Sequence, residues 1–371
     1  MYVHLPFCPY ICPYCDFAKW PHKASAAAAY LQALHEEIAS LQTTPARTIF
    51  LGGGTPNTYD ARDLARLLAA IMEKFPSSNA PEISIEVNPE LVVARDLERY
   101  AAMGISRVSI GVQSFQENEI ATLGRRHSPA DVARVVSYAR AAGLRSVSLD
   151  LMFAVPGQTP ESWRASVRAA IDLGVDHVST YGLTIEEGTP FKAWEQREPA
   201  AFFDDTREAG FYADAIDLLE AAGFEQYEIS NFAKPGQQCL HNVNYWENGE
   251  YVGLGVGAAS YRDGVRSVHT RRLDEYLAAI AGGDAIPSES ERLEGARRAG
   301  EAVMLALRTA QGVCLGQFKE RYGLDFLEFY GSIVTRFIED GVLESDARNV
   351  RLTRRGRFLA NTVCEAFVTR P

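Results

Sequence analysis

Short apolar runs alternate with longer amphipathic stretches over the first two hundred or so residues. Six runs are short and rich in β-branched or large apolar side chains, so strands are predicted at residues 2–5, 48–51, 83–87, 107–112, 146–150 and 177–181. Apolar residues at helical spacing predict helices around residues 31–41, 64–71, 97, 130–142, 163–173 and 204–222. This alternation predicts parallel strands joined by right-handed crossovers, and six units of this kind indicate an α/β barrel or partial barrel.

Glycines and polar residues stand at the carboxyl ends of the predicted strands, where ligands bind in folds of this kind. They are Gly53, Gly54, Thr55, Glu86, Asn88, Gln113 and Asp150. Taken singly, each has an ordinary explanation, such as a tight turn or a charge at a helix N-terminus. Because several of them coincide at one end of the sheet, together they predict a ligand site there.

The pattern changes after about residue 235. Residues 234–264 are rich in glycine, asparagine and aromatic residues, and the run 253–257 is only weakly typical of a nucleotide loop because no lysine follows it. From about residue 291 the helical spacing returns, with short strands predicted near Leu343, Val350 and Leu352. We therefore divide the chain into a barrel (1–233), a connection (234–290) and a small, winged-helix-like α+β domain (291–371).

The composition excludes several classes of protein. With 47% hydrophobic and 23% charged residues, the chain has the make-up of a folded globular protein and not of a disordered, fibrous or coiled-coil one. No apolar run approaches the ~20 residues that a membrane-spanning helix needs, and the first residues do not resemble a secretory signal. A net charge of −11 disfavours wholesale binding to nucleic acid or anionic membranes. We expect a cytoplasmic protein without a transmembrane segment.

Three of the six cysteines lie close together, in the run Cys8-x3-Cys12-x2-Cys15 directly after the first predicted strand. Thiolates are the ligands that zinc and iron–sulfur clusters select. A structural zinc site would need a fourth ligand, which would have to be His4, His22 or Cys239. Three cysteines on one loop favour a [4Fe–4S] cluster with one open iron. The other three cysteines are scattered singly, as buried structural thiols usually are.

The cysteine spacing, with the aromatic Tyr14 before the third cysteine, resembles that of the radical S-adenosylmethionine (SAM) superfamily. This resemblance implies that the open iron is chelated by the amino and carboxylate groups of SAM. Within the superfamily, several motifs are similar to those of the oxygen-independent coproporphyrinogen III oxidase family. They are residues 2–8, 52–56, 86–89, 111–115, 123–125 and 150–152.

Carried over residue by residue, the family resemblance implies a set of side chains that line the SAM site. They are Tyr2, Tyr14, Gly53, Gly54, Thr55, Glu86, Gln113, Arg125 and Asp150. The carboxylates suit ribose hydroxyls or the neighbourhood of the sulfonium, and the guanidinium of Arg125 suits a carboxylate. The chain departs from the family in Phe153-Ala154-Val155-Pro156, where a glycine and a leucine usually precede the proline.

Two further features resemble the haem chaperone (HemW) branch of this family. Phe17 stands where the true oxidases carry a fourth cysteine, and His241-Asn-x-x-Tyr245-Trp246 is similar to the haem-binding motif of the branch. The resemblance implies His241 as an axial ligand, with the two aromatic rings packed on a porphyrin. A hydrogen-bonded loop histidine is the alternative interpretation of His241, and Cys239 is a rival ligand.

Three functions follow from these patterns. The first is a haem chaperone that carries a [4Fe–4S] cluster and SAM and passes haem to a client haemoprotein; a homodimer and peripheral membrane contact stay open. The alternative is an oxygen-independent coproporphyrinogen III oxidase, a radical decarboxylase of porphyrinogen propionates, which Phe17 disfavours. The third is nucleic-acid binding by the arginines of the last domain (Arg348, Arg351, Arg354, Arg355 and Arg357). Acidic neighbours favour a solvated surface instead, so no nucleic acid is expected.

Overall fold

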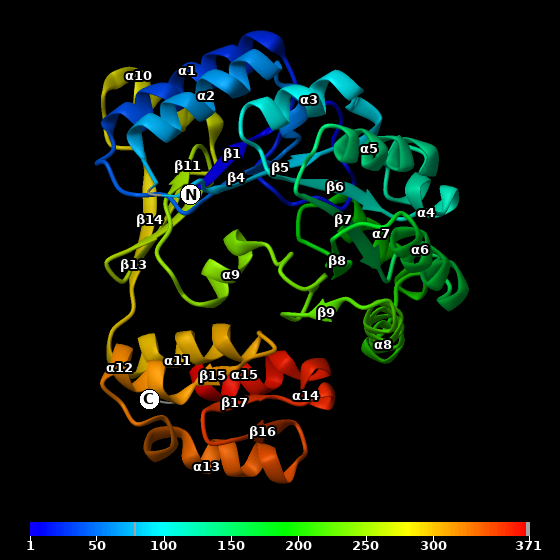
Figure 1. The fold of residues 1–371 in the computed structure, drawn as a ribbon, viewed down its shortest axis with the longest axis vertical. Coiled ribbons are helices and arrows are strands. Elements are labelled where there is room, and N and C mark those ends of the chain that lie inside the picture. Colours follow the sequence, from blue (N-terminus) through cyan, green and yellow to red (C-terminus); the bar gives the residue numbers. More distant parts are fainter. Residues whose placement is uncertain (78, 369–371) are drawn as a thin grey trace.

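A computed structural model describes residues 1–77 and 79–368 and shows an α/β partial barrel above a smaller C-terminal domain (Figure 1). All six predicted strands of the barrel are confirmed, and each agrees with its predicted range to within three residues. They are β1 (Tyr2–Leu5), β4 (Thr48–Gly53), β5 (Glu82–Val87), β6 (Arg107–Gln113), β7 (Ser146–Phe153) and β8 (His177–Gly182). The predicted helices are α1 (Ala24–Ser40), α2 (Ala61–Lys74), α3 (Ala94–Ala102), α5 (Pro129–Ala141), α6 (Pro160–Asp172) and α8 (Asp205–Ala221). Sequence periodicity missed the short helices α4 (Glu117–Thr122) and α7 (Pro190–Arg197).

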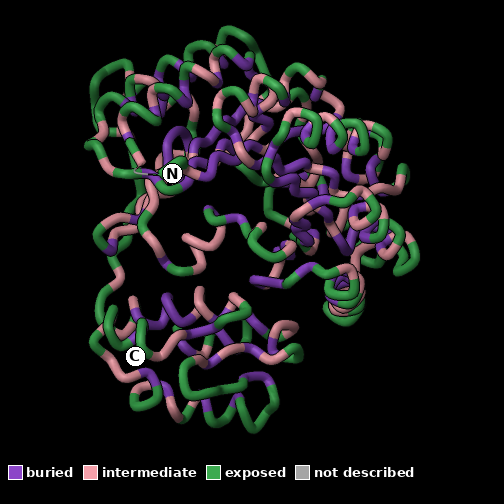
Figure 2. The backbone as a smooth tube through the Cα atoms, in the orientation of Figure 1, coloured by how far each residue is buried: buried purple, intermediate pink, exposed green. Residues whose placement is uncertain are grey.

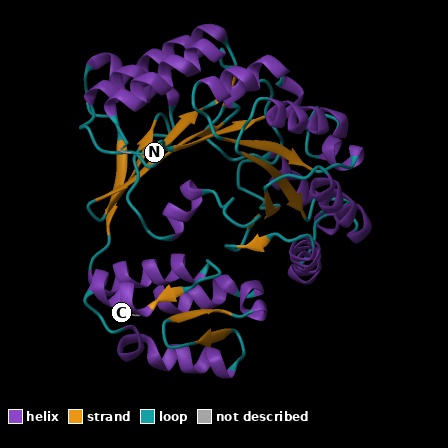
Figure 3. Cartoon of the chain, in the orientation of Figure 1, coloured by secondary structure: helices purple, strands orange, loops and turns teal. Residues whose placement is uncertain are grey.

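The barrel sheet has the strand order β11-β1-β4-β5-β6-β7-β8-β10-β9. The six strands pair in parallel, and β11 (Gly253–Leu254) extends the sheet in parallel beyond β1. At the other edge, β10 (Asn231–Ala233) and β9 (Glu225–Gln226) are added in antiparallel order. The glycine-rich run after residue 252 is thus partly an edge strand. Figure 3 shows the helices on the convex side of the curved sheet, so its concave side faces the C-terminal domain.

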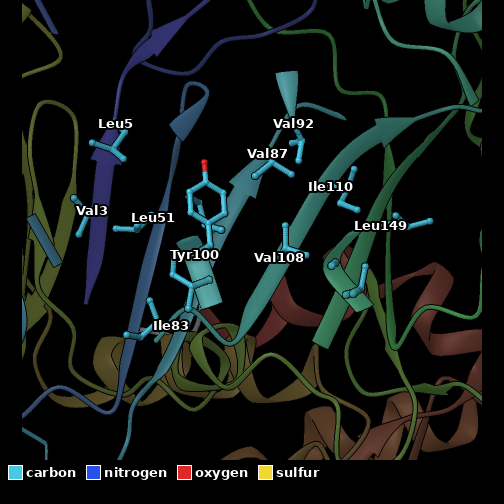
Figure 4. Close-up of a cluster of buried hydrophobic side chains, with 14 of the residues drawn as sticks. Val3, Leu5, Leu51, Ile83, Val87, Val92, Tyr100, Val108, Ile110 and Leu149 are labelled. Atoms are coloured by element: carbon cyan, nitrogen blue, oxygen red, sulfur yellow. The ribbon is translucent and has the colours of Figure 1, made fainter. Parts of the chain in front are cut away.

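The strands read as continuous apolar runs because helices cover their outer side chains. Figure 4 shows part of the resulting core, in which side chains from neighbouring strands meet. Val3, Leu5, Leu51, Val108 and Ile110 are all fully buried there. Burial is concentrated along the sheet and on the helix faces turned to it (Figure 2). This core aligns the carboxyl ends of the strands at one edge.

Residues 234–294 carry the chain from the barrel to the C-terminal domain. The short helix α9 (Leu240–Trp246) lies between the barrel sheet and the C-terminal domain (Figure 1). Beside it, β12 (Ala259–Arg262), β13 (Val265–His269) and β14 (Ser288–Arg292) form an antiparallel sheet. Helix α10 (Leu273–Gly282) packs against α1.

The C-terminal domain has its own hydrophobic core, which includes Val303, Phe326, Tyr330 and Phe367. Its elements are α11 (Gly295–Leu307), β15 (Val313–Cys314), α12 (Leu315–Tyr322), α13 (Phe326–Glu339), β16 (Leu343–Ser345), β17 (Asn349–Leu352), α14 (Arg354–Phe358) and α15 (Ala360–Val368). Helices followed by a small β-wing, in the order β15-β17-β16, are the predicted winged-helix-like arrangement.

Several arginines of the wing region pair with carboxylates. Arg351 contacts Glu344 at 2.6 Å, and Arg354 forms an ion pair with Asp217 on helix α8 of the barrel. The guanidinium groups of Arg351 and Arg354 are therefore paired within the protein. Within residues 1–77 and 79–368, we find no helix that combines the length and the apolar character needed to cross a bilayer.

Candidate functional site

The three clustered cysteines lie on a loop that is closed at its base by two short strands. Strand β2 (Phe7–Cys8) pairs with β3 (Trp20–Pro21), and the Cys15 amide donates to the Cys12 carbonyl at 3.2 Å. All three thiols are free and only partly buried. In the described part of the chain, no three His, Cys, Asp or Glu side chains converge closely enough to hold a single metal ion. The donor set of three free thiols on one loop suits an iron–sulfur cluster.

The Cys8 thiol lies beside Thr55, which follows the end of β4. Burial raises the pKa of the Cys8 thiol to about 11, and a hydrogen bond with the Thr55 side chain partly opposes this shift. The thiol is therefore protonated at neutral pH. Because a metal ligand must be the thiolate, cluster binding at this position has to release a proton.

Arg125 reaches from the loop after α4 to the end of β6. Its guanidinium donates to the Gly111 carbonyl, while its buried Nε has no partner among the described residues. Tyr14 and Cys12 lie close enough to this guanidinium to interact with its charge, and against the opposing effect of burial they raise the pKa of Arg125. A Cβ on Gly111 would lie 3.2 Å from Arg125 Nη2 and 3.4 Å from Gln113 Nε2, so these two side chains meet above the glycine. Gln113 itself sits at an irregularity of β6 with a φ of 65°.

Two carboxyl groups lie on neighbouring parts of the sheet, Glu86 next to the carboxyl end of β5 and Asp150 within β7. The Gly53 amide donates to Glu86 Oε2 at 3.0 Å, and the Ser109 hydroxyl donates to Asp150 Oδ1 at 3.0 Å. Burial, together with the nearby Asp150, raises the pKa of Glu86 to about 7. Burial also raises the pKa of Asp150 to about 6. The pair therefore suits hydroxyl or amine groups that donate hydrogen bonds.

The glycine turn after β4 packs tightly against the first strand. A Cβ on Gly53, whose φ is 109°, would lie 2.4 Å from His4 Nδ1. A Cβ on Gly54 would lie 2.7 Å from the carbonyl carbon of Pro6. Only glycine fits this close approach. The amides of the turn are engaged within the protein, since the Gly53 amide donates to Glu86 Oε2 and the Gly54 amide to the Leu5 carbonyl. This close packing fixes the path of the turn beside the first strand.

Tyr2 stands between the SAM residues and the predicted haem motif. Its hydroxyl is 2.9 Å from His4 Nδ1, and its ring stacks on Phe50 with the centroids 6.3 Å apart. Phe50 in turn stacks on His241 at 5.1 Å. Among the predicted SAM residues, Gly53, Glu86 and Gln113 lie at the carboxyl ends of β4, β5 and β6. Asp150 lies within β7, Tyr2 is the first residue of β1, and Tyr14 belongs to the cysteine loop.

His241 lies on α9, near the opposite end of β4. Its Nδ1 is 2.9 Å from the Thr48 hydroxyl, and its Nε2 is 2.9 Å from the Tyr245 hydroxyl. The side chain is buried, which holds the pKa of His241 well below its usual range. Thr48 and Gly53 begin and end β4, so roughly 16 Å of strand separates the histidine from the glycine turn. In this conformation both ring nitrogens are engaged by protein hydroxyls.

Glu82 and Arg107 hold α9 and were missed by the sequence analysis. Glu82 Oε1 accepts hydrogen bonds from the amides of Leu240 at 2.9 Å and His241 at 3.3 Å, and it lies 3.8 Å from Cys239 Sγ. Arg107 Nε is 3.5 Å from the same carboxylate, and both side chains are buried. Each is the first residue of its strand, and a charge at a strand start is the signal that could have revealed them.

Comparisons with known proteins agree with this geometry. Residues 2–170 match the model of the Radical SAM superfamily, and residues 293–359 match that of the HemN C-terminal domain. Proteins described as heme chaperone HemW are 35% identical in Bacillus subtilis (99% of this chain, 98% of the relative) and 34% identical in Escherichia coli (99% and 97%). The solved coproporphyrinogen III oxidase HemN of E. coli superposes with a TM-score of 0.85 at 23% identity, over 99% of this chain and 89% of that one.

Proposed function

Because this chain belongs to the HemW family of radical SAM proteins, we propose that it binds haem and delivers it to a client haemoprotein. Full-length similarity to proteins named as haem chaperones carries this proposal. The motif His241-Asn-x-x-Tyr245-Trp246 on α9 supports it, since imidazole is a common axial ligand of haem iron. We assign the protein to the cytoplasm, where thiols stay reduced.

Membership of the superfamily implies a [4Fe–4S] cluster and SAM, and the residues present suit both groups. Cys8, Cys12 and Cys15 would hold the cluster through their thiolates. When bound, the cluster and SAM supply one-electron chemistry. Arg125 Nε, which has no partner among the described residues, would pair with the carboxylate of SAM.

The remaining residues of the site would orient SAM. Glu86 and Asp150 would accept hydrogen bonds from its hydroxyl or amino groups, and the pKa of about 7 allows Glu86 to hold a proton near neutral pH. Tyr2 and Gln113 would close the sides of the site from β1 and β6.

Haem is the cargo in this proposal, and His241 is its proposed axial ligand. The observed conformation is a closed one, because Thr48 and Tyr245 occupy both imidazole nitrogens. Ligation through Nε2 requires that the Tyr245 hydroxyl be displaced. Burial keeps the imidazole neutral, which is the form that binds iron.

One experiment tests the function. Protein with an anaerobically reconstituted cluster is titrated with haem and then assayed with coproporphyrinogen, using the parent, His241→Ala and His35→Ala. We expect the parent and His35→Ala, which changes a partly exposed histidine on α1, to bind haem equally. Loss of the imidazole ligand should weaken binding by His241→Ala at least tenfold. Identical haem titrations for His241→Ala would exclude this ligand, and turnover to protoporphyrinogen would favour the oxidase alternative.

A further inference from the structure

The helix that carries His241 is held at both ends by charged side chains. Helix α9 has only seven residues, and a helix this short is marginal without outside contacts. At its N-terminus, the Glu82 carboxylate accepts from the amides of Leu240 and His241. At its C-terminus, the Arg321 guanidinium donates to the carbonyls of Glu247, at 2.7 Å, and Asn248. Both charges have the sign that the helix dipole favours.

The two clamping residues belong to different parts of the molecule. Glu82 starts β5 of the barrel, whereas Arg321 lies on α12 of the C-terminal domain. Asn248, two residues beyond the end of α9, is buried and adopts a φ of 51°. Helix α11 also packs against α9 (Figure 1). The position of α9 therefore depends on a contact that the C-terminal domain provides.

Exposing His241 requires α9 to move. Thr48, which holds Nδ1, is part of the rigid β4 strand, while Tyr245, which holds Nε2, lies one turn along α9 itself. The imidazole also stacks on Phe50 of the same strand. A porphyrin cannot reach the ring face or Nε2 while α9 rests on β4. Lifting the end of α9 stretches the hydrogen bonds from Arg321.

We propose that the C-terminal domain gates access to His241 through Arg321, whose guanidinium holds α9 in the closed position on β4. Release of Arg321 frees the C-terminal end of α9, so that Tyr245 leaves Nε2 and the imidazole becomes accessible to haem. This gate rests on the proposed haem function. It makes haem uptake responsive to movement of the C-terminal domain, for instance when a client protein contacts that domain.

The test compares Arg321→Gln with Lys319→Gln in the full chain. Lys319 is on the same helix but pairs with Asp325, at 3.2 Å, and does not touch α9, so it is the matched control. Hydrogen–deuterium exchange of the amides of residues 243–249 is measured without haem. Stopped-flow absorbance then follows haem association. Because Arg321 is exposed, we expect exchange and association to accelerate only about three- to tenfold in Arg321→Gln, and neither to change in Lys319→Gln.

Arg321→Lys provides a second variant should the glutamine variant fold poorly. It keeps the charge but loses the planar fork that bridges two carbonyls, so a smaller acceleration is expected. Unchanged exchange in both variants overturns the proposal. Faster exchange with unchanged haem association also overturns it and leaves Arg321 a purely structural clamp. Haem binding that is insensitive to His241→Ala would instead refute His241 as the haem ligand. The exchange measurement is made without haem, so it tests the Arg321 clamp independently of that result.

Discussion

Glu86 and Asp150 lie in an environment that differs from that of an ordinary carboxylate. Their folded pKa values of about 7 and about 6 lie above the reference values of 4.5 and 3.8. The folded protein therefore retains protons that the unfolded chain releases. The resulting stabilisation is complete below the reference values and is lost as the pH rises through the folded pKa values.

We expect the melting temperature of the SAM-free protein to fall as the pH rises from about 5 to about 8. The glutamine in Glu86→Gln cannot ionise, so the variant should show a smaller fall in stability over this pH range. Because Glu86 is partly exposed, we expect the difference in the free energy of unfolding to be on the order of 1–2 kcal/mol. Differential scanning calorimetry across this range measures both slopes. Glu98→Gln, an exposed change on α3, should keep the parent slope. An equally steep slope in Glu86→Gln would contradict the raised pKa.

Ala154 explains one departure from the family pattern. Its φ is 61°, in the left-handed region that glycine adopts without strain. The glycine that the family resemblance implies before the proline would adopt this φ without strain, so alanine is the less suitable residue here.

At the scale of elements, the starts of β5 and β6 are joined by the buried pair of Glu82 and Arg107. The guanidinium also donates to the carbonyls of Gln237 and Gln238, at 2.7 and 2.9 Å. Two neighbouring strands and the segment before α9 therefore meet at one ion pair. Removing one charge leaves the other buried and unpaired.

We predict that Glu82→Gln lowers the free energy of unfolding by about 3 kcal/mol, because Arg107 loses its counter-charge in a buried site. The double variant Glu82→Gln/Arg107→Gln should recover part of this loss. Urea unfolding of the four members of the cycle gives the coupling energy. Additive effects of the two single substitutions would show that the charges do not interact.

At the scale of the whole molecule, the three clustered cysteines lie outside the hydrophobic cores, although Tyr14 of the same loop packs against a small buried cluster that includes Phe191. Cys8, Cys12 and Cys15 are not among the buried core residues. In contrast, Leu5 of β1 and Leu51 of β4, the strands that flank the base of the loop, belong to the core. The fold is therefore expected to form before the cluster is inserted. Cluster assembly then adds a cofactor to a finished barrel.

Accordingly, Cys12→Ser should lose the iron and the visible absorbance of the reconstituted cluster. Its metal-free form should unfold within about 0.5 kcal/mol of the metal-free parent, as expected for a partly exposed loop position. Iron analysis and urea unfolding measure the two effects. Cys314→Ser, in the C-terminal domain, should keep the iron. Full iron content in Cys12→Ser, or a metal-free parent that does not fold, would contradict this account.

The sequence by itself determined the repeating unit of this protein and the chemistry at its strand ends. Strand and helix periodicities are local properties, so all six barrel strands could be predicted to within a few residues. The cysteine spacing is equally local, and it indicates a cluster loop before any contact is known. Residues such as Gly53, Glu86 and Asp150 could be grouped because parallel strands end at the same edge.

Only the tertiary structure decided how α9 is held. Glu82 and Leu240 are 158 positions apart, and Arg321 is 73 positions from Asn248, so no local pattern relates them. The pairing of β11 with β1 and the occupied nitrogens of His241 likewise depend on packing between distant segments. Hydrophobic periodicity specifies which face of an element is buried, but the partner of a buried polar group is set by the three-dimensional path of the chain.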